Sequence, residues 1–295
     1  MDFGRLVTAM VTPFNKDLQI NWPEVEVLIN YLIEVQKTDS IVICGTTGES
    51  PTLTEEEKHQ LFALAVKCAN GRCKIIAGTG SYATASTINA TQQAEKLGVD
   101  GILLVAPYYN RPSQEGLYQH FKAVAEATSL PIMLYNVPHR AGISVSYETT
   151  VRLAQIPNIV ASKEAHSDLD HMTQIIIRVP QHFKVYSGDD SLTLPVLAIG
   201  GYGIVSVASH IIGAEMKQMI TYFLQGEIVK ATQMHARLFP VFKGIFRMPS
   251  PAPIKHALII KGFNVGGVRL PLVEVTESEE TFLKSLINSL KTTNS

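Results

Sequence analysis

Lys163 is the residue of this chain whose position could support chemistry. It follows Ile159, Val160 and Ala161, an apolar run typical of a strand buried on both faces, and polar residues begin directly after it. An unpaired ammonium in such a setting loses hydration worth several kcal/mol. Burial also lowers the pKa of a lysine, and the neutral amine is the form that attacks a ketone to give a Schiff base. Alternatively, the lysine extends to the surface or pairs with Glu164.

The elements that must position this lysine alternate between strand and helix patterns. We expect strands at residues 6–12, 41–43, 74–77, 101–105, 131–134, 159–163, 184–186 and 203–207. Helices are expected at residues 23–34, 54–69, 84–97, 113–128, 146–155, 169–179 and 191–199. A repeat of about 25–30 residues with this count favours an α/β fold, the closed parallel (β/α)8 TIM barrel, with no strand left over. A doubly wound sheet is the alternative, but no Gly-x-Gly-x-x-Gly follows the first strand.

The pattern changes after residue 226. Helices are expected at residues 227–246, 254–261 and 276–290, with no strand pattern between them. We therefore predict a catalytic barrel over residues 1–225 and a small all-helical C-terminal domain over residues 226–295.

Composition excludes several classes of function. The chain has 295 residues, of which 46% are hydrophobic and 17% charged, with a formal net charge of −1 and no basic stripe. Nucleic acid and anionic membranes are therefore poor partners. The sequence shows neither a long apolar span nor a signal-peptide pattern at its start. Its three cysteines have no C-x-x-C spacing, which argues against a disulfide framework or a zinc site. We expect a cytoplasmic protein.

A TIM barrel places its active site at the C-terminal ends of the strands. The residues that should meet there with Arg140 nearby are Thr46, Thr47, Tyr109, Tyr135, Lys163, Gly188 and Val205. This set contains no group of His, Asp and Glu with metal-ligand spacing, so we expect no metal. The chemistry expected is organic: an amine nucleophile, phenolic acid–base groups, and hydroxyl and backbone N–H donors.

Each of these signals has a second interpretation when it is taken alone. The run Gly45–Gly48 can present successive N–H groups to a carboxylate, or it can be a turn that needs glycine for its φ angles. Tyr135 can be a core aromatic residue, and Tyr109 can simply pack within its loop. Arg140 and His166 follow strands and can face solvent.

Taken together, the motifs resemble the dihydrodipicolinate synthase family, within the N-acetylneuraminate lyase superfamily of pyruvate-dependent class I aldolases. The matching runs are VTPF from Val11, GTTGES from Gly45, AGTG from Ala77, APYYNRPSQEGLYQHF from Ala106, LYNVP from Leu134, KEA from Lys163, SGDD from Ser187 and RLPL from Arg269. They occur in the family's order and cover nearly the whole chain.

The resemblance implies a role for each candidate residue. Lys163 would form the imine with pyruvate, and Tyr135 would carry protons during imine and enamine formation. Thr47 would link Tyr135 to Tyr109, which in this family reaches in from the neighbouring subunit of a tight dimer. The family is usually a homotetramer of two such dimers. No cofactor is implied beyond the covalent pyruvate imine itself.

The resemblance also implies how the substrates are held. Thr46 and Thr47 would bind the pyruvate carboxylate, with Gly188 and Val205 completing the site. Arg140 would receive the carboxylate of L-aspartate 4-semialdehyde, the second substrate. The product would be 4-hydroxy-tetrahydrodipicolinate, in the first committed step of the diaminopimelate and lysine pathway.

Some positions depart from the family pattern. His166 and Ser167 stand where Ser or Thr and then Gly are common, Ala141 where a hydroxyl residue is usual, and Val205 where isoleucine is usual.

The positions that match the lysine feedback site of regulated members also differ. They are Glu55, Lys58, Tyr82 and Ser86, with Ser50, Pro51 and Tyr108 nearby. Lys58 in place of a histidine would repel the ammonium group of the effector, and an acidic partner is lost. We therefore predict weak or absent inhibition by L-lysine.

Three alternatives remain to be weighed. An aldolase for sialic acid or a 2-keto-3-deoxy sugar acid would generally lack an arginine at the position of Arg140. A non-catalytic ligand-binding relative is disfavoured because the catalytic set is complete. A phosphate-binding barrel is disfavoured because Asp189 and Asp190 are acidic where phosphate would bind.

Overall fold

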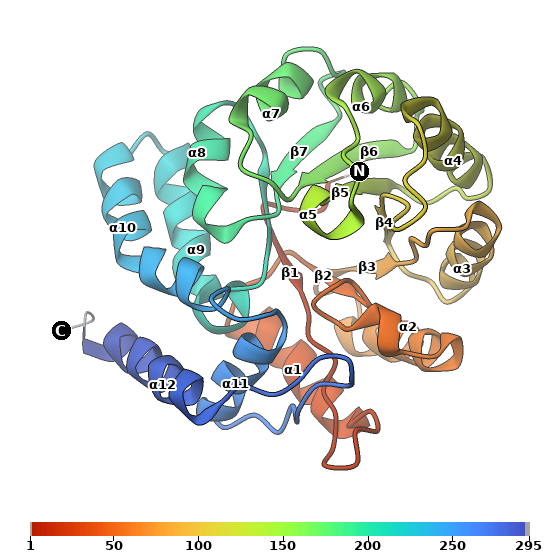
Figure 1. The fold of residues 1–295 in the computed structure, drawn as a ribbon. Coiled ribbons are helices and arrows are strands. Elements are labelled where there is room, and N and C mark those ends of the chain that lie inside the picture. The colour runs from red at the N-terminus through yellow and green to blue at the C-terminus, as the bar shows by residue number, and fades with distance from the viewer. Residues whose placement is uncertain (1, 293–295) are drawn as a thin grey trace.

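Eight parallel strands close into a barrel in the computed structural model, which describes residues 2–292 (Figure 1). The strands are β1 (Leu6–Ala9), β2 (Ser40–Ile43), β3 (Lys74–Gly78), β4 (Gly101–Val105), β5 (Ile132–Asn136), β6 (Ile159–Glu164), β7 (Lys184–Ser187) and β8 (Gly203–Ser206). Each strand pairs with the next along the chain, and β8 pairs with β1. The predicted TIM barrel is confirmed.

Helices surround this barrel (Figure 1). They are α1 (Trp22–Glu34), α2 (Glu55–Ala69), α3 (Thr84–Lys96), α4 (Gln114–Glu126), α6 (Tyr147–Leu153), α7 (Leu169–Ile176), α8 (Thr193–Ala198) and α9 (Ser209–Leu224). Three short turns of helix lie in the loops: η1 (Ser50–Thr52), α5 (Pro138–Ala141) and η2 (Asp190–Leu192). The capping box expected from Thr54 and Glu57 opens α2, because each side chain bonds the backbone N–H of the other residue.

The structure corrects the ends of two predicted strands and adds one helix. β1 ends at Ala9 rather than at residue 12, because the N–H of Val11 donates to Nε2 of His210 instead of a neighbouring strand. The helix α9 had no predicted counterpart, and its periodicity is interrupted by the non-helical backbone of Ile212. β5 continues to Asn136, so Tyr135 lies within the strand rather than after it.

Side chains inside the barrel form a core separate from the one between strands and helices. The inner cluster includes Val7, Val42, Ile76, Leu103, Met133, Tyr135, Ala161, Tyr186 and Val205. Because side chains alternate along a strand, Lys163 shares the inward face of Ala161, two residues before it. Ser162 and Glu164 then face outward, toward the helices.

The C-terminal part is helical, as predicted. It consists of α10 (Ile228–Gly244), α11 (Ala252–Ile260) and α12 (Glu277–Thr292), which lie on one side of the barrel (Figure 1). α10 packs against α9 and α12, and α11 packs against the same two helices. The division into domains at residue 226 stays a prediction.

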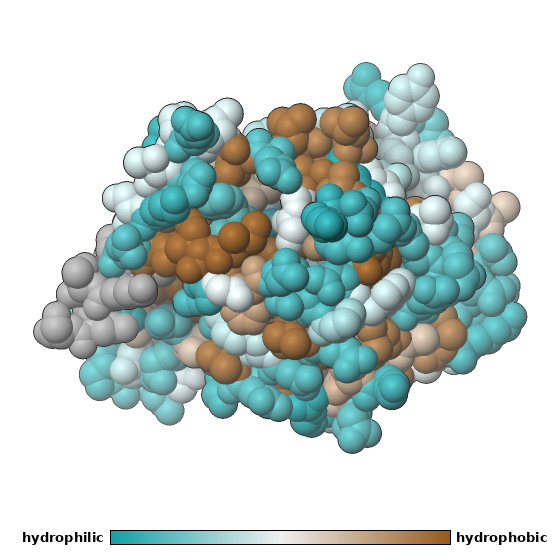
Figure 2. All heavy atoms as spheres, turned by 90° about the horizontal axis from the view of Figure 1, so that it is seen from below, coloured by the Kyte–Doolittle hydropathy of each residue, from teal (hydrophilic) through white to brown (hydrophobic). Residues whose placement is uncertain are grey.

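The surface seen from below is mostly hydrophilic, with separate hydrophobic patches between hydrophilic side chains (Figure 2). Within the described part of the chain, every helix is too short or too polar to span a bilayer.

Candidate active site

Lys163 lies near the C-terminal end of β6, inside the barrel. Its side chain is 6% exposed, and its Nζ atom lies 4.1 Å from the centre of the Tyr135 ring. The two residues are paired across β5 and β6, and Lys163 pairs on its other side with Tyr186 of β7. The buried lysine that the sequence predicted is therefore present, and its amine lies over the ring of Tyr135.

Gly188 lies against this lysine, and Val205 lies in the same inner core of the barrel. A Cβ atom at Gly188 would lie 3.0 Å from Cε of Lys163 and 2.6 Å from Cβ of Ala165. Only glycine therefore leaves the lysine its space. Val205 is buried on β8 in the inner cluster that also holds Tyr135.

The loop after β2 lies at the same end of the barrel and is held by its own backbone, since the N–H groups of Gly48 and Glu49 donate to the carbonyls of Gly45 and Thr46. Cys44 and Glu49, on either side of the run Gly45–Gly48, have φ angles of 56° and 57°. Such angles are uncommon for residues other than glycine, and they mark a backbone held in one shape by its surroundings. Thr47 is buried, whereas Thr46 lines the adjoining cavity.

A cavity of about 230 Å³ opens at this end of the barrel. Its lining includes Gly45, Thr46, Tyr108, Tyr135, Arg140 and Ala141. Thr47, Lys163, Gly188 and Val205 lie outside the cavity lining. The cavity therefore brings the Tyr135 ring, on which the lysine amine rests, together with a guanidinium group.

Arg140 belongs to α5, the single turn of helix that follows β5, and its side chain is exposed where it faces the cavity. Its neighbour His139 has a pKa below the ordinary value. Burial is the main cause of the lowered pKa, and the charge of Arg140 lowers it further. A hydrogen bond with the backbone of Ala165 has the opposite, raising effect. This end of the site is therefore positively charged and open to solvent.

Tyr109 is placed differently from the other candidates. It is 93% exposed and has a φ angle of 73°, and Arg111 two residues later has a φ angle of 46°. Its neighbour Tyr108 lines the cavity and packs edge-on against Tyr82. Within a single chain, then, Tyr109 projects into solvent instead of joining Tyr135.

A second cavity of about 610 Å³ adjoins the first, and Ser50, Pro51 and Tyr108 line both. All seven positions matched to the feedback site line it: Ser50, Pro51, Glu55, Lys58, Tyr82, Ser86 and Tyr108. Lys58 Nζ lies 2.8 Å from Glu55 Oε1, so its charge is paired within α2.

Sequence analysis did not predict a polar cluster on the outward side of β6, next to Lys163. Glu164 is fully buried, and its Oε2 atom lies 2.9 Å from His166 Nε2 and 3.7 Å from His171 Nε2. Burial lowers the pKa of His171, against the opposing effect of the Glu164 carboxylate. His166 thus turns inward, where a solvent-facing position was one interpretation. The available signal was Glu164 directly after Lys163 and Asn136 directly after Tyr135, each a polar residue at the end of a buried strand.

Comparison with known proteins gives the family. The profile of the Dihydrodipicolinate synthetase family matches residues 2–290. The chain belongs to this family. The 4-hydroxy-tetrahydrodipicolinate synthase of Bacillus subtilis is 54% identical over 291 residues, covering 98% of this chain and 100% of the relative. The dihydrodipicolinate synthetase family consists of class I aldolases, lyases that work without a metal ion or an organic cofactor.

Solved structures of dihydrodipicolinate synthases have the same fold. One from Bacillus anthracis superposes with a TM-score of 0.96 at 52% identity, covering 98% of this chain and 99% of that one. Another, from Acinetobacter baumannii and complexed with pyruvate, gives 0.95 at 39% identity, with 98% and 99% covered. The chain is therefore an enzyme of the lyase class in this family.

Proposed function

We propose that this chain condenses pyruvate with L-aspartate 4-semialdehyde through an imine on Lys163, the 4-hydroxy-tetrahydrodipicolinate synthase reaction of the lysine pathway. The observation that carries the proposal is the buried Lys163 amine, held over the Tyr135 ring at the C-terminal end of β6. Full-length relatives that carry this enzyme name support the choice of reaction.

The first half of the mechanism makes a nucleophile from pyruvate. The Lys163 amine attacks the ketone carbon, and the hydroxyl of Tyr135 returns protons so that water leaves and an imine forms. Thr46 and Thr47 hold the carboxylate through hydroxyl and N–H groups. The imine makes the methyl carbon acidic, and transfer of one of its protons to the Tyr135 oxygen gives an enamine. Gly188 leaves room for the lysine chain, and Val205 closes the apolar side of the site.

The second half uses the open, cationic end of the site. Arg140 binds the carboxylate of the semialdehyde and directs its aldehyde carbon toward the enamine. After the new carbon–carbon bond forms, the substrate's own amine displaces Lys163 by transimination. Because this amine and the imine carbon belong to the same condensed molecule, the displacement closes the ring and restores the free lysine. The chain and the two substrates supply every group that these steps use, and Lys163 carries each covalent intermediate, beginning with the pyruvate imine.

Tyr109 enters this scheme from a second subunit. Its near-complete exposure supports insertion into a neighbouring site, where Thr47 would connect it to Tyr135. We infer a tight dimer that completes two sites, and a homotetramer of two such dimers. The cytoplasmic location stays a prediction from the sequence.

The test is steady-state turnover of pyruvate with aspartate semialdehyde, run beside cleavage of N-acetylneuraminate. We expect consumption of the semialdehyde that depends on pyruvate, and no cleavage of the sugar acid. If borohydride traps pyruvate on Lys163 without turnover of the semialdehyde, the aldolase chemistry stands and the substrate assignment is wrong.

A further inference from the structure

Arg140 lies in a loop that starts after Asn136, and the side chain of Asn136 also binds the backbone where the loop ends, at Val145. The N–H of Val145 donates to Asn136 Oδ1 over 3.0 Å, and Asn136 Nδ2 donates to the carbonyl of Val145 over 3.3 Å. The amide thus binds both backbone groups of Val145, as a neighbouring strand would. Residues 137–144, with α5 and Arg140 among them, form the closed loop between these two anchor points.

The orientation of that amide is fixed by Glu164. Asn136 Nδ2 donates to Glu164 Oε2 over 2.9 Å, while Oδ1 must face the N–H of Val145. An amide turned over would set two acceptors against each other at one end and two donors at the other. Asn136 and Glu164 are also paired across β5 and β6, one residue after Tyr135 and Lys163.

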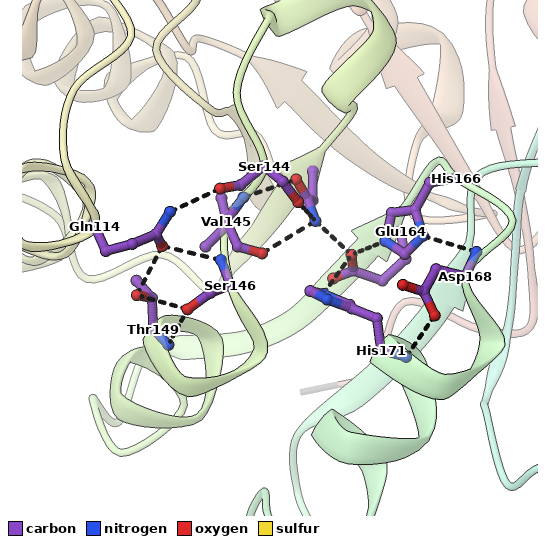
Figure 3. A network of polar contacts seen from close by, with 10 residues as sticks. Gln114, Ser144, Val145, Ser146, Thr149, Glu164, His166, Asp168 and His171 are labelled. Atoms are coloured by element: carbon purple, nitrogen blue, oxygen red, sulfur yellow. Dashed lines mark hydrogen bonds and ion pairs between the residues drawn. The ribbon is translucent and has the colours of Figure 1, made fainter.

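His166 supplies the second donor to the same carboxylate oxygen. The N–H of Asp168 donates to His166 Nδ1 over 3.2 Å, so the proton of the neutral ring lies on Nε2, 2.9 Å from Glu164 Oε2. Figure 3 shows Glu164 between His166 and His171 on one side and the segment Ser144–Val145 on the other.

The same cluster has the composition of a metal site, because Glu164, His166 and His171 offer ligand atoms within 4.8 Å of one another. A histidine that binds a metal donates its other ring N–H to an acceptor. Here that nitrogen, Nδ1 of His166, accepts a hydrogen bond from the Asp168 N–H. Hydrogen bonds therefore link His166 to Glu164 and Glu164 to the Asn136 amide, whereas His171 lies 3.7 Å from the carboxylate.

We propose that Asn136 is a positioning residue for the second substrate, because it closes the Arg140 loop, and that Glu164 with His166 sets the orientation of its amide. This inference rests on the proposed function in that Arg140 receives the carboxylate of the semialdehyde. The residues that position Arg140 for the semialdehyde carboxylate would then lie between the strands and the helices, away from the reacting atoms. In the proposed mechanism the pyruvate carboxylate binds at the loop after β2, outside the loop of residues 137–144 that Asn136 closes, so binding of that carboxylate should not depend on Asn136.

The test compares Asn136→Ala and Glu164→Ala with Glu164→Gln, which keeps an acceptor for the amide. For the two alanine variants we expect the KM for aspartate semialdehyde to rise about tenfold, with the KM for pyruvate changed less than about twofold. Glu164→Gln should stay within about threefold of the wild type for both substrates. Thr91→Val is the matched control, because it removes one buried hydrogen bond, to Thr79, outside this loop.

Two further readouts keep the outcome clear. Trapping of pyruvate on Lys163 with borohydride should proceed as in the wild type. Amide hydrogen exchange should quicken over residues 137–145 in the alanine variants and not in Thr91→Val. Equal rises in both KM values, or unchanged exchange over this segment, would overturn the proposal. If the wild type does not consume the semialdehyde, the proposed function is wrong instead. Hydrogen exchange would still test whether Asn136 and Glu164 close the loop of residues 137–144.

Discussion

The Nζ atom of Lys163 lies 4.1 Å from the centre of the Tyr135 ring, and the two residues face each other across neighbouring strands. An aromatic face attracts an ammonium by about 0.5–2 kcal/mol, more where water is excluded. Tyr135 lines the cavity, so its ring holds the lysine side chain beside the cavity before any substrate arrives. The same side chain carries the phenol that can exchange protons with the developing imine.

Replacing Lys163 with alanine should abolish the covalent step. We expect turnover to fall by at least about 10⁴-fold, and borohydride with pyruvate to leave the mass of the protein unchanged. Lys184→Ala is the control, since this lysine begins β7 at the opposite end of the barrel. That variant should still gain the pyruvate adduct. An adduct on Lys163→Ala would show that a different amine is the nucleophile.

Removing only the Tyr135 hydroxyl separates proton transfer from packing. Tyr135→Phe keeps the ring against Lys163, so its melting temperature should stay close to that of the wild type. We expect kcat to fall by about 10²–10⁴-fold, the usual size of a general acid–base contribution. Stopped-flow formation of the pyruvate imine should slow as well. Imine formation at the wild-type rate would assign the proton shuttle to another group.

Much of this arrangement could be predicted from local sequence. The apolar run before Lys163 and the regular alternation of strands and helices identify both the barrel and the end at which its chemistry lies. Because side chains alternate along a strand, Lys163 lies on the same face of β6 as Ala161, two residues before it.

The contacts behind the strands could not be predicted in this way. Asn136 meets Glu164 only through the pairing of β5 with β6, which contains a shift in register between Ile132 and Met133. The inward turn of His166 depends in addition on the backbone of Asp168. Neither the register nor the return of a loop is encoded in a short run of residues.

His210 should make the fold sensitive to acid. It is fully buried, its Nε2 accepts the N–H of Val11, and its Nδ1 contacts the carbonyl of Val207 as a donor would. Burial lowers its pKa from 6.5 to about 4. Between these values the unfolded chain binds a proton that the folded chain does not, so stability rises with pH and is lost as the pH falls from 6.5 toward 4.

The full loss amounts to about 3 kcal/mol, from about 1.4 kcal/mol per pH unit. Urea unfolding of the wild type and His210→Gln at several pH values between 7 and 4 measures it. The wild type should lose about 2–3 kcal/mol more than the variant over this range. Exposed His182→Gln should follow the wild type. Parallel curves for the wild type and His210→Gln would contradict the expectation.

The C-terminal helices are joined to the loop after β2 by a buried ion pair. Lys255 Nζ on α11 lies 3.2 Å from Glu49 Oε1, and both side chains are almost fully buried. The N–H of Arg269 also donates to this carboxylate, over 3.0 Å. Burial lowers the pKa of Lys255 to about 8, against the raising effect of Glu49.

Lys255→Met should therefore cost about 3–5 kcal/mol of unfolding free energy, because it leaves the Glu49 carboxylate buried without its cation. The double variant Lys255→Met with Glu49→Gln should recover part of this loss. Lys284→Met breaks an exposed pair with Glu280 and should cost less than about 1 kcal/mol. A Lys255→Met protein as stable as Lys284→Met would show that the buried pair does not hold the C-terminal part in place.

The cavity beside the active site should bind L-lysine weakly. Lys58 places a cation in its lining, and its pairing with Glu55 leaves that carboxylate less able to attract a second ammonium group. We expect the wild type to keep more than half of its activity at about 1 mM lysine, and Lys58→His to be inhibited at lower concentrations. Lys67→His, on the same helix but outside the cavity lining, is the matched control and should behave as the wild type. Strong inhibition of the wild type at sub-millimolar lysine would mean that the effector's ammonium group finds a partner other than the residues around Lys58.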